Sequence, residues 1–448
     1  MGRERKVMNP SNNKVTFFAS IQWMFFIFVN VVVVPISIGA AFELSTGEIV
    51  SILRTSLVVT GAACILQGWI GHRYPLLEGP SGIIWGVMLT LGASAPSLGL
   101  SLKEVGGGIA TGMLLAGAVT ILLALFGAVS FINKIFKPMV MNVFLMLLSI
   151  QLAIIFFDGM ISVADDGTMN VTITLFSLVI VIFVAFLKIR GNSLISNFSL
   201  LIGIIVGWPI FKLLFPDAGS IASMTQGSGG LILFPLGTPN LQLSIVIMTF
   251  IACLLNMSNT FASIQAAAVL YKEAPERNRY RNSMLLTGGY SMIGSLFGLV
   301  AYAPFASSIG FLESTQIYEK KPYYWGGAMI IALGVVPGLA VMLAQLPITV
   351  GNAVLFVAYL QLFGTALKSV RDYAFNSVTV HRFAAPVLLG VSIMMADPKL
   401  FTSLPSVIQP LVSNGFIIGV LLSIVLEHTM RWQEDAGTAE KTEKLNSK

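Results

Sequence analysis

The sequence predicts an all-α membrane protein that crosses the bilayer about fourteen times. Hydrophobic residues make up 56% of its 448 residues and charged residues only 10%, whereas a soluble domain carries roughly 25% charged residues. The few charges cluster, so that long apolar runs remain, such as 17–41, 171–187 and 325–346. A run of about 18 apolar residues, at ~1.5 Å rise per residue, spans the ~30 Å hydrocarbon core. A single run of this kind could be a signal peptide or a membrane anchor. More than ten of them exclude that interpretation, and they exclude a soluble protein.

Hydropathy places the spans in fourteen segments, and the basic residues orient them. With the N-terminus in the cytoplasm, 22 of the 26 basic residues fall on the cytoplasmic side and 4 outside, as the positive-inside rule requires. We therefore expect cytoplasmic termini, a plasma-membrane location, and a basic excess that reflects topology in a lipid bilayer and not binding to nucleic acid. The predicted spans are 15–39, 52–71, 75–94, 105–129, 138–157, 170–189, 194–215, 243–268, 284–299, 302–318, 323–344, 347–366, 383–396 and 408–429.

A weakly hydrophobic stretch rich in Gly, Ser and Pro divides the chain into two halves of seven spans. An odd number of spans per half makes the second half enter from the opposite side, so the repeat must be inverted, as in many secondary transporters. The expected organisation is a cytoplasmic N-terminus (1–14), a first repeat (15–215), an external linker (216–242), a second repeat (243–429) and a cytoplasmic tail (430–448).

The third span of each half begins with a proline-containing segment. The third span reads Glu78-Gly79-Pro80-Ser81-Gly82, and the tenth reads Ala303-Pro304-Phe305-Ala306-Ser307-Ser308-Ile309-Gly310. Pro80 and Pro304 are 224 residues apart (304 − 80), half the chain length. Proline removes a donor and restricts the preceding residue, and freed backbone groups at membrane depth are tolerated only in protein or beside a wet cavity. Interrupted helices are therefore expected at both places; a pair of ordinary proline kinks is the alternative.

These motifs resemble the nucleobase–cation symporter-2 family, also called nucleobase–ascorbate transporters, over essentially the whole chain. The resemblance rests on Ile21-Gln22-Trp23 through Val34-Pro35, on 79–82, on Leu255-Asn256 through Ser263, and on 303–310. It implies a core of spans 1–4 and 8–11 and a gate of spans 5–7 and 12–14. It also implies short antiparallel β-strands in spans 3 and 10, proton-coupled uptake of a nucleobase such as xanthine or uracil by alternating access, and a homodimer formed through the gate domain.

Three positions depart from the family pattern. The family usually has a glutamate where this chain has Asn256, often another acid or amide where it has Ser307, and a histidine where it has Trp23. His72, His381 and His428 are all expected at cytoplasmic span ends. We therefore expect no metal site, no cofactor and no intramembrane imidazole that relays a proton.

The candidate substrate site centres on the eighth span. Asn256, Asn259, Thr260 and Ser263 occupy positions i, i+3, i+4 and i+7, one face of a helix, and a carboxamide can pair with the mixed donors and acceptors of a nucleobase edge. The alternative for this face is interhelical hydrogen bonding. Carried over from the resemblance, the substrate-binding residues are Asn256, Thr260, Phe305, Ala306, Ser307 and Gly82, with Gln22 either a neighbour of the site or a packing amide. Gly108, Gly112 and Gly117 are interpreted as close-packing residues.

Two acids in the paired broken segments, Glu313 and Glu78, are the candidates for proton coupling. A charged group near the bilayer centre costs about 2.5–3.5 kcal/mol on insertion scales, so such an acid usually has a function. The alternative is that each lies at a membrane interface.

A membrane enzyme is not expected, because no intramembrane His/Asp/Ser constellation or metal-ligand spacing is present. An anion exchanger, or a sulfate- or bicarbonate-type carrier of the same fold, is the main alternative function, since half-helix dipoles can hold an anion. Among nucleobases, the tenth-span segment is closer to the purine branch of the family, so a purine is favoured over uracil.

Overall fold

The computed structural model describes residues 13–127, 137–163, 168–191, 193–216, 230–274, 276–343, 345–371, 373, 376–405, 408–430 and 432. The predicted N-terminal segment (1–14) and cytoplasmic tail (430–448) lie largely outside these residues, as does the part 217–229 of the predicted linker (216–242). In this part of the chain, seven helices are long and apolar enough to cross a membrane by length and composition. The prediction of an apolar helical membrane protein is confirmed at that level, and the count of fourteen stays a prediction.

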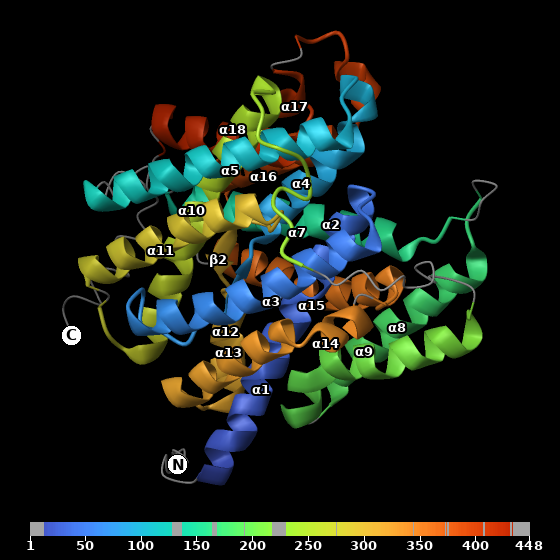
Figure 1. Ribbon diagram of the computed structural model, residues 1–448. Coiled ribbons are helices and arrows are strands. Elements are labelled where there is room, and N and C mark those ends of the chain that lie inside the picture. Colours follow the sequence, from blue (N-terminus) through green and yellow to red (C-terminus); the bar gives the residue numbers. More distant parts are fainter. Residues whose placement is uncertain are drawn as a thin grey trace. The chain divides into compact units, whose positions relative to one another are not determined.

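Helices make up most of both halves (Figure 1). In the first half they are α1 (Asn13–Val31), α2 (Val33–Ala41), α3 (Thr46–Trp69), α4 (Gly82–Ser94), α5 (Leu102–Leu125), α7 (Pro138–Met160), α8 (Val171–Arg190) and α9 (Ser193–Leu214), with a 3₁₀ turn at Pro96–Leu98. In the second half they are α10 (Leu243–Tyr271), α11 (Arg277–Leu296), α12 (Ser307–Thr315), α13 (Lys320–Val335), α14 (Pro337–Leu343), α15 (Ile348–Arg371), α16 (Ser377–Met394), α17 (Gln409–Val412) and α18 (Gly415–Thr429), with a 3₁₀ turn at Pro398–Phe401.

Local sequence signals set several helix starts. Ser45 caps α3 and Ser101 caps α5, each in a complete capping box with the glutamate three residues later. Each box satisfies two backbone N–H groups that the first turn would otherwise leave without a partner. Asn170 caps α8 in the simpler way, by accepting a hydrogen bond from the backbone N–H of Ile173 at 3.2 Å.

The chain divides into two compact units, of residues 1–129 with 155–358, and of residues 130–154 with 359–448. The predicted core and gate would divide it at other places and stay a prediction. In the smaller unit, α16 packs on α18. A Cβ on Gly415 would lie 2.0 Å from the carbonyl oxygen of Gly390, so these two helices approach as closely as they do because both positions are glycine.

In the larger unit, α13 packs on α1 and α3, and α5 packs on α10 and α11. Glycines make close crossings of these helices possible. A Cβ on Gly61 of α3 would lie 2.4 Å from the Gly327 carbonyl oxygen of α13, and a Cβ on Gly117 of α5 would lie 2.8 Å from the Gly288 carbonyl oxygen of α11. Gly108 and Gly112 approach α10 in the same way, so the prediction that these glycines are packing residues is confirmed.

Two short strands interrupt the helices at the predicted places. β1 (Glu78–Pro80) precedes α4, and β2 (Tyr302–Pro304) precedes α12. They pair antiparallel, with Glu78 opposite Pro304, Gly79 opposite Ala303, and Pro80 opposite Tyr302. Both strands are fully buried, and Figure 1 shows β2 close to α10 and α11, which both contact it. The predicted antiparallel pair is thus present, and each strand leads directly into a short helix.

Candidate functional site

The paired strands form a crossing with local two-fold symmetry. The Ser81 N–H donates to the Ala301 carbonyl, and the Phe305 N–H donates to the Leu77 carbonyl, each at 2.8 Å. These two bonds are exchanged by a shift of 224 residues (305 − 81 and 301 − 77), the separation of the two prolines. The axis of this relation passes between Gly79 and Ala303, which face each other in the register.

The α10 face clamps both strands. Asn256, only 3% exposed, accepts a hydrogen bond from the Ser81 hydroxyl at 2.6 Å and donates one to the Tyr302 carbonyl at 3.0 Å. Two turns further along α10, the Ser263 hydroxyl donates to the Pro304 carbonyl at 3.0 Å. The polar stripe predicted on this helix therefore satisfies backbone and hydroxyl groups where the helices are broken.

The remaining predicted substrate residues lie at or next to this crossing. Gly82 is the first residue of α4 and is half-buried; Phe305 is half-buried between β2 and α12; and Ala306 and Ser307, at the start of α12, are exposed. The Thr260 hydroxyl is buried and has no hydrogen-bond partner among the described residues. Gln22 lies half-buried on α1, a helix that contacts β1.

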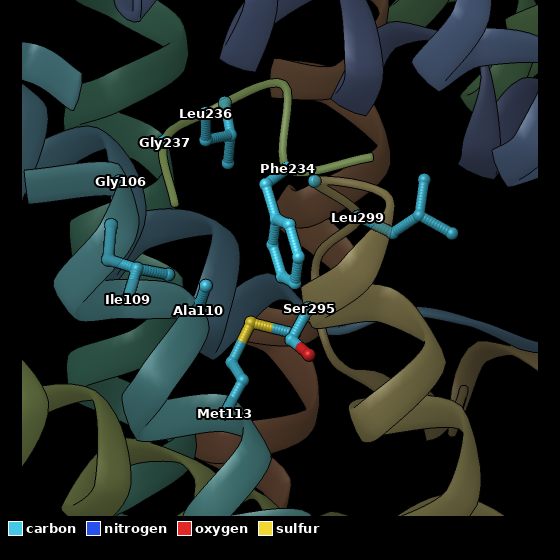
Figure 2. A pocket seen from close by; sticks show the side chains of 10 residues that line it. Gly106, Ile109, Ala110, Met113, Phe234, Leu236, Gly237, Ser295 and Leu299 are labelled. Carbon is cyan, nitrogen blue, oxygen red and sulfur yellow. The ribbon is translucent and has the colours of Figure 1, made fainter. Parts of the chain in front are cut away.

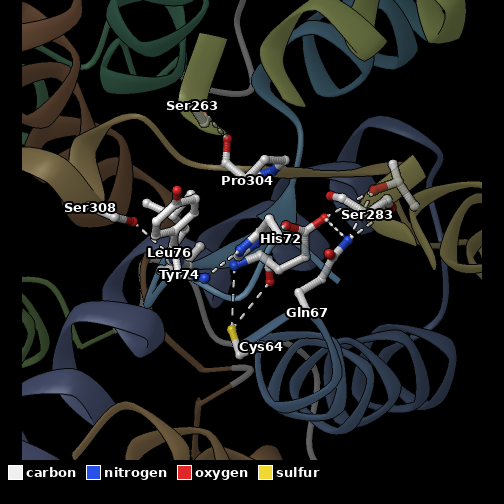
Figure 3. Close-up of polar contacts among 12 residues, drawn as sticks. Cys64, Gln67, His72, Tyr74, Leu76, Ser263, Ser283, Pro304 and Ser308 are labelled. Carbon is white, nitrogen blue, oxygen red and sulfur yellow. Dashed lines mark hydrogen bonds and ion pairs between the residues drawn. The ribbon is translucent and has the colours of Figure 1, made fainter. Parts of the chain in front are cut away.

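A buried polar cluster lies on the other side of β1 (Figure 3). The Glu78 side chain is 0% exposed, and its Oε1 accepts long hydrogen bonds from Gln67 Nε2 and from the Thr287 hydroxyl, each at 3.4 Å. Gln67 Nε2 also reaches the Ser283 carbonyl and the Thr287 hydroxyl, each at 3.2 Å. The other acid candidate, Glu313, is exposed on α12. The two candidates for proton coupling therefore lie in different environments.

His72 is the residue of this cluster that sequence reasoning missed. It was expected at a cytoplasmic span end, but its side chain is fully buried, with Nε2 3.9 Å from Glu78 Oε2. The expectation of no intramembrane imidazole stays a prediction, and the structure adds that this imidazole is buried within the protein. The chain beyond α3 does not stay at the surface: it returns through residues 70–77 to enter β1. The sequence shows that His72 and Glu78 are close along the chain, but it does not show that the segment 70–77 between α3 and β1 is largely buried.

A small pocket is separate from these residues. It is lined by α5, by the loop before α10, and by the end of α11. Figure 2 shows the Phe234 ring projecting into it toward Met113 and Ser295. A second small pocket has Pro80 of β1 in its lining. None of the predicted substrate-binding residues lines either pocket.

Comparisons with known proteins agree with the fold and with the resemblance. The chain is 27% identical over 427 residues to "Putative purine permease YwdJ" of Bacillus subtilis, covering 92% of this chain and 96% of that protein. It is 22% identical to the uric acid transporter UacT of Escherichia coli (91% and 84% covered), and 23% identical to the xanthine permease of Bacillus subtilis (92% of each covered). All three are named as transport proteins, in agreement with the prediction that the chain is not an enzyme.

Among solved structures, the transmembrane domain of the cyanobacterium bicarbonate transporter BicA matches with a TM-score of 0.59 at 13% identity, over 93% of this chain and 98% of that chain. SLC26A9 matches with a TM-score of 0.63 at 12% identity, over 94% and 67%. At this level of identity the likeness establishes the fold alone. The family model described as "Permease family" (Xan_ur_permease) matches residues 14–399. The chain therefore belongs to the permease family that this model describes, and it is a multi-pass membrane transport protein.

Proposed function

We propose that this permease is a secondary active transporter that imports a nucleobase, a purine in preference to uracil, across the plasma membrane by proton-coupled alternating access. The observation that carries this proposal is the crossing of β1 and β2 held by Asn256. There, two broken helices, an amide and exposed chain at the start of α12 come together. The purine, uric acid and xanthine permeases among its relatives support the choice of a purine.

Asn256 would be the principal contact to the base. Its carboxamide has two N–H donors and two acceptor lone pairs, and Ser81 and Tyr302 use one of each. One donor and one acceptor remain, which suits the edge of a neutral heterocycle. Backbone N–H groups at the starts of α4 (Gly82) and α12 (Ala306, Ser307) would hold carbonyl oxygens of the base. In this assignment Phe305 covers the ring face, the Thr260 hydroxyl supports Asn256, and Gln22 borders the site.

The proposed architecture is fourteen spans in two inverted repeats. Counting spans along the chain, α3–α13 is the pair 2–11 and α1–α13 the pair 1–11. Each span of the first half corresponds to the span seven places later in the second half. The pairs equivalent to 2–11 and 1–11 are therefore 9–4 and 8–4, which are α11–α5 and α10–α5. Both partner pairs are among the main helix contacts of the larger unit. This pattern supports an inverted repeat. The core of spans 1–4 and 8–11, the gate of spans 5–7 and 12–14, the cytoplasmic termini and a homodimer through the gate are further parts of the proposal, taken from the family resemblance and the charge distribution.

For coupling, Glu78 is the stronger of the two acid candidates. A buried carboxylate is costly to keep ionised without strong partners, so uptake of a proton relieves that cost. Glu313 is exposed on α12 and is the second candidate.

Radiolabelled uptake in a host that lacks its own base transporters tests the proposal. The substrates are xanthine, hypoxanthine, guanine, uric acid and uracil, each with and without a proton uncoupler. Asn256→Ala should abolish purine uptake. Asn30→Ala is the matched control, because among the described residues the Asn30 amide donates only within its own helix, to the Phe26 carbonyl at 2.7 Å. Purine uptake that survives Asn256→Ala would remove the site, and absence of any nucleobase uptake would remove the function.

A sulfate or bicarbonate carrier is the second candidate, supported by the shared fold with BicA and SLC26A9 and by two helix N-termini at one crossing. Sulfate and bicarbonate belong in the same assay. Saturable sulfate or bicarbonate uptake without nucleobase uptake would select this alternative.

A further inference from the structure

Three polar atoms in the cluster behind β1 share one property. Glu78 Oε2, His72 Nε2 and Gln67 Oε1 are all buried, and none has a hydrogen-bond partner among the described residues. Buried polar atoms in folded proteins are nearly always paired, because an unpaired one costs free energy. Three such atoms in one cluster indicate a functional arrangement rather than a packing requirement.

The hydrogen bonding of His72 defines which of its nitrogens carries the proton. Its Nδ1 accepts the backbone N–H of Tyr74 at 3.0 Å, so in the neutral ring the proton lies on Nε2. That Nε2–H faces the Glu78 carboxyl oxygen across 3.9 Å, about 1 Å more than a hydrogen bond. A small side-chain movement would therefore create a direct Nε2–H···Oε2 bond.

The local two-fold symmetry of the crossing allows Glu78 to be compared with the equivalent residue of the other half. The residue related to Glu78 is Tyr302, 224 positions later. The Tyr302 hydroxyl contacts the Thr60 hydroxyl at 3.0 Å and the Ser56 carbonyl at 3.3 Å. At equivalent backbone positions, one half thus carries a phenol with hydrogen-bond partners and the other carries a carboxyl group with one oxygen that has none among the described residues. Since the fold requires only the first kind, the acid has another use.

We propose that Glu78 and His72 together form the proton-binding site of the transporter, with His72 as the partner of the ionised state. Glu78 Oε2 takes up one proton from the aqueous phase and becomes a neutral carboxylic acid, with the gap to His72 open. On losing that proton, the carboxylate closes on the Nε2–H of His72. This inference rests on the proposed proton-coupled transport and assigns its proton site.

The site is linked to the substrate crossing through a short stretch of chain. Glu78 is three residues from Ser81, whose hydroxyl holds Asn256. A movement of Glu78 toward His72 is therefore transmitted along β1 to the amide proposed to read the base. On its other side, His72 stacks with Tyr74, with ring centroids 6.3 Å apart.

An ion pair lies beyond Tyr74, on the side of the α10–α11 loop. Arg279 lies 4.9 Å above the Tyr74 ring and forms an ion pair with Glu273 at 2.8 Å. The hydrogen bond from Arg279 lowers the pKa of Glu273 below its ordinary value, so this pair is ionised at neutral pH. The titratable or charged groups that face Glu78 or His72 from the elements packed around them are Cys64, Tyr74, Glu273, Arg279, Tyr290, Tyr302, Lys320 and Tyr323.

Two substitutions at His72 separate this role from a structural one. Asparagine can place an acceptor where Nδ1 lies and keep the bond from the Tyr74 N–H, but it has no group at the Nε2 position. Glutamine can place an N–H donor at the Nε2 position and loses that acceptor. The assay uses purified protein in liposomes, with xanthine and hypoxanthine, and measures both gradient-driven accumulation and exchange of internal for external base without a gradient. His381→Asn, on an exposed histidine of α16, is the control.

We expect His72→Asn to lower accumulation by about tenfold more than it lowers exchange, because it removes a hydrogen bond to a charged group. His72→Gln should retain most of the accumulation, and Glu78→Gln should give exchange that no longer responds to pH. Equal accumulation in wild type and His72→Asn, or impairment of His72→Gln alone, would overturn the proton site. Wild-type exchange without proton-driven accumulation would overturn it as well. Absence of exchange in the wild type is the distinct result that overturns the nucleobase function itself, and the proton site with it.

Discussion

The hydrogen bond between Ser81 and Asn256 allows a quantitative prediction. Ser81→Ala removes the donor 2.6 Å from Asn256 Oδ1 and leaves a buried carboxamide oxygen with one partner fewer. Loss of a partner by a buried polar group costs about 1–3 kcal/mol. If the cost falls on the state that binds substrate, the Kd for the preferred purine rises by a factor of about 5 to 150.

The assay is equilibrium binding of radiolabelled purine to purified protein, with thermal unfolding in detergent measured on the same samples. Ser258→Ala is the matched control, since Ser258 is on the same helix as Asn256, is equally buried, and donates only to the Leu255 carbonyl of its own helix. In thermal unfolding, a double-mutant cycle of Ser81→Ala with Asn256→Ala should show non-additive effects, because each substitution removes the same bond. The reasoning is refuted if Ser81→Ala and Ser258→Ala have the same Kd and the same unfolding temperature.

Three further perturbations act on the fold. Gly61→Ala should greatly reduce the yield of folded protein in size-exclusion chromatography, because its Cβ would lie 2.4 Å from a backbone oxygen of α13. Gly47→Ala is the control and should be tolerated, because a Cβ at Gly47 would lie in open space. Equal yields of the two variants would contradict the packing argument. Arg382→Ala should destabilise the protein by about 3 kcal/mol, because it leaves Glu427, 4% exposed, without the two hydrogen bonds at 2.7 and 2.8 Å. Glu427→Gln in that background should restore part of the loss of thermal stability, and no recovery would argue against the ion pair. Tyr302→Phe should lower the unfolding temperature through loss of its two hydroxyl contacts, with an unchanged temperature as the contrary result.

Much of the site could be predicted because its signals are local. A proline at equivalent places in two spans predicted interrupted helices, and both interruptions are strands in the structure. The polar residues of α10 recur at helical spacing, so their common face could be predicted without knowing what it contacts. The contact itself could not be: Asn256 bonds to residues 175 and 46 positions away along the chain.

The different burial of the two acids, Glu78 and Glu313, could not be predicted from the sequence. Glu78 lies just before Pro80 and Glu313 lies after Pro304 in the sequence. Hydropathy alone therefore predicts similar surroundings for the two acids. In the folded chain Glu78 is enclosed by α3, α11 and the return segment, whereas Glu313 is exposed on α12. Burial of a single side chain depends on what packs against it from distant parts of the chain, and no local pattern contains that information.

The amino-acid sequence by itself determined that this protein is a bundle of apolar helices with paired interruptions, because a bilayer imposes length and hydrophobicity on every crossing segment. It also determined the permease family, through motifs spread along the chain. Only the tertiary structure decided that Asn256 holds the two strands together and that His72 lies buried beside Glu78. Both facts depend on where the chain returns after a helix ends, which is set by non-local packing and hydrogen bonding rather than by the residues of that segment.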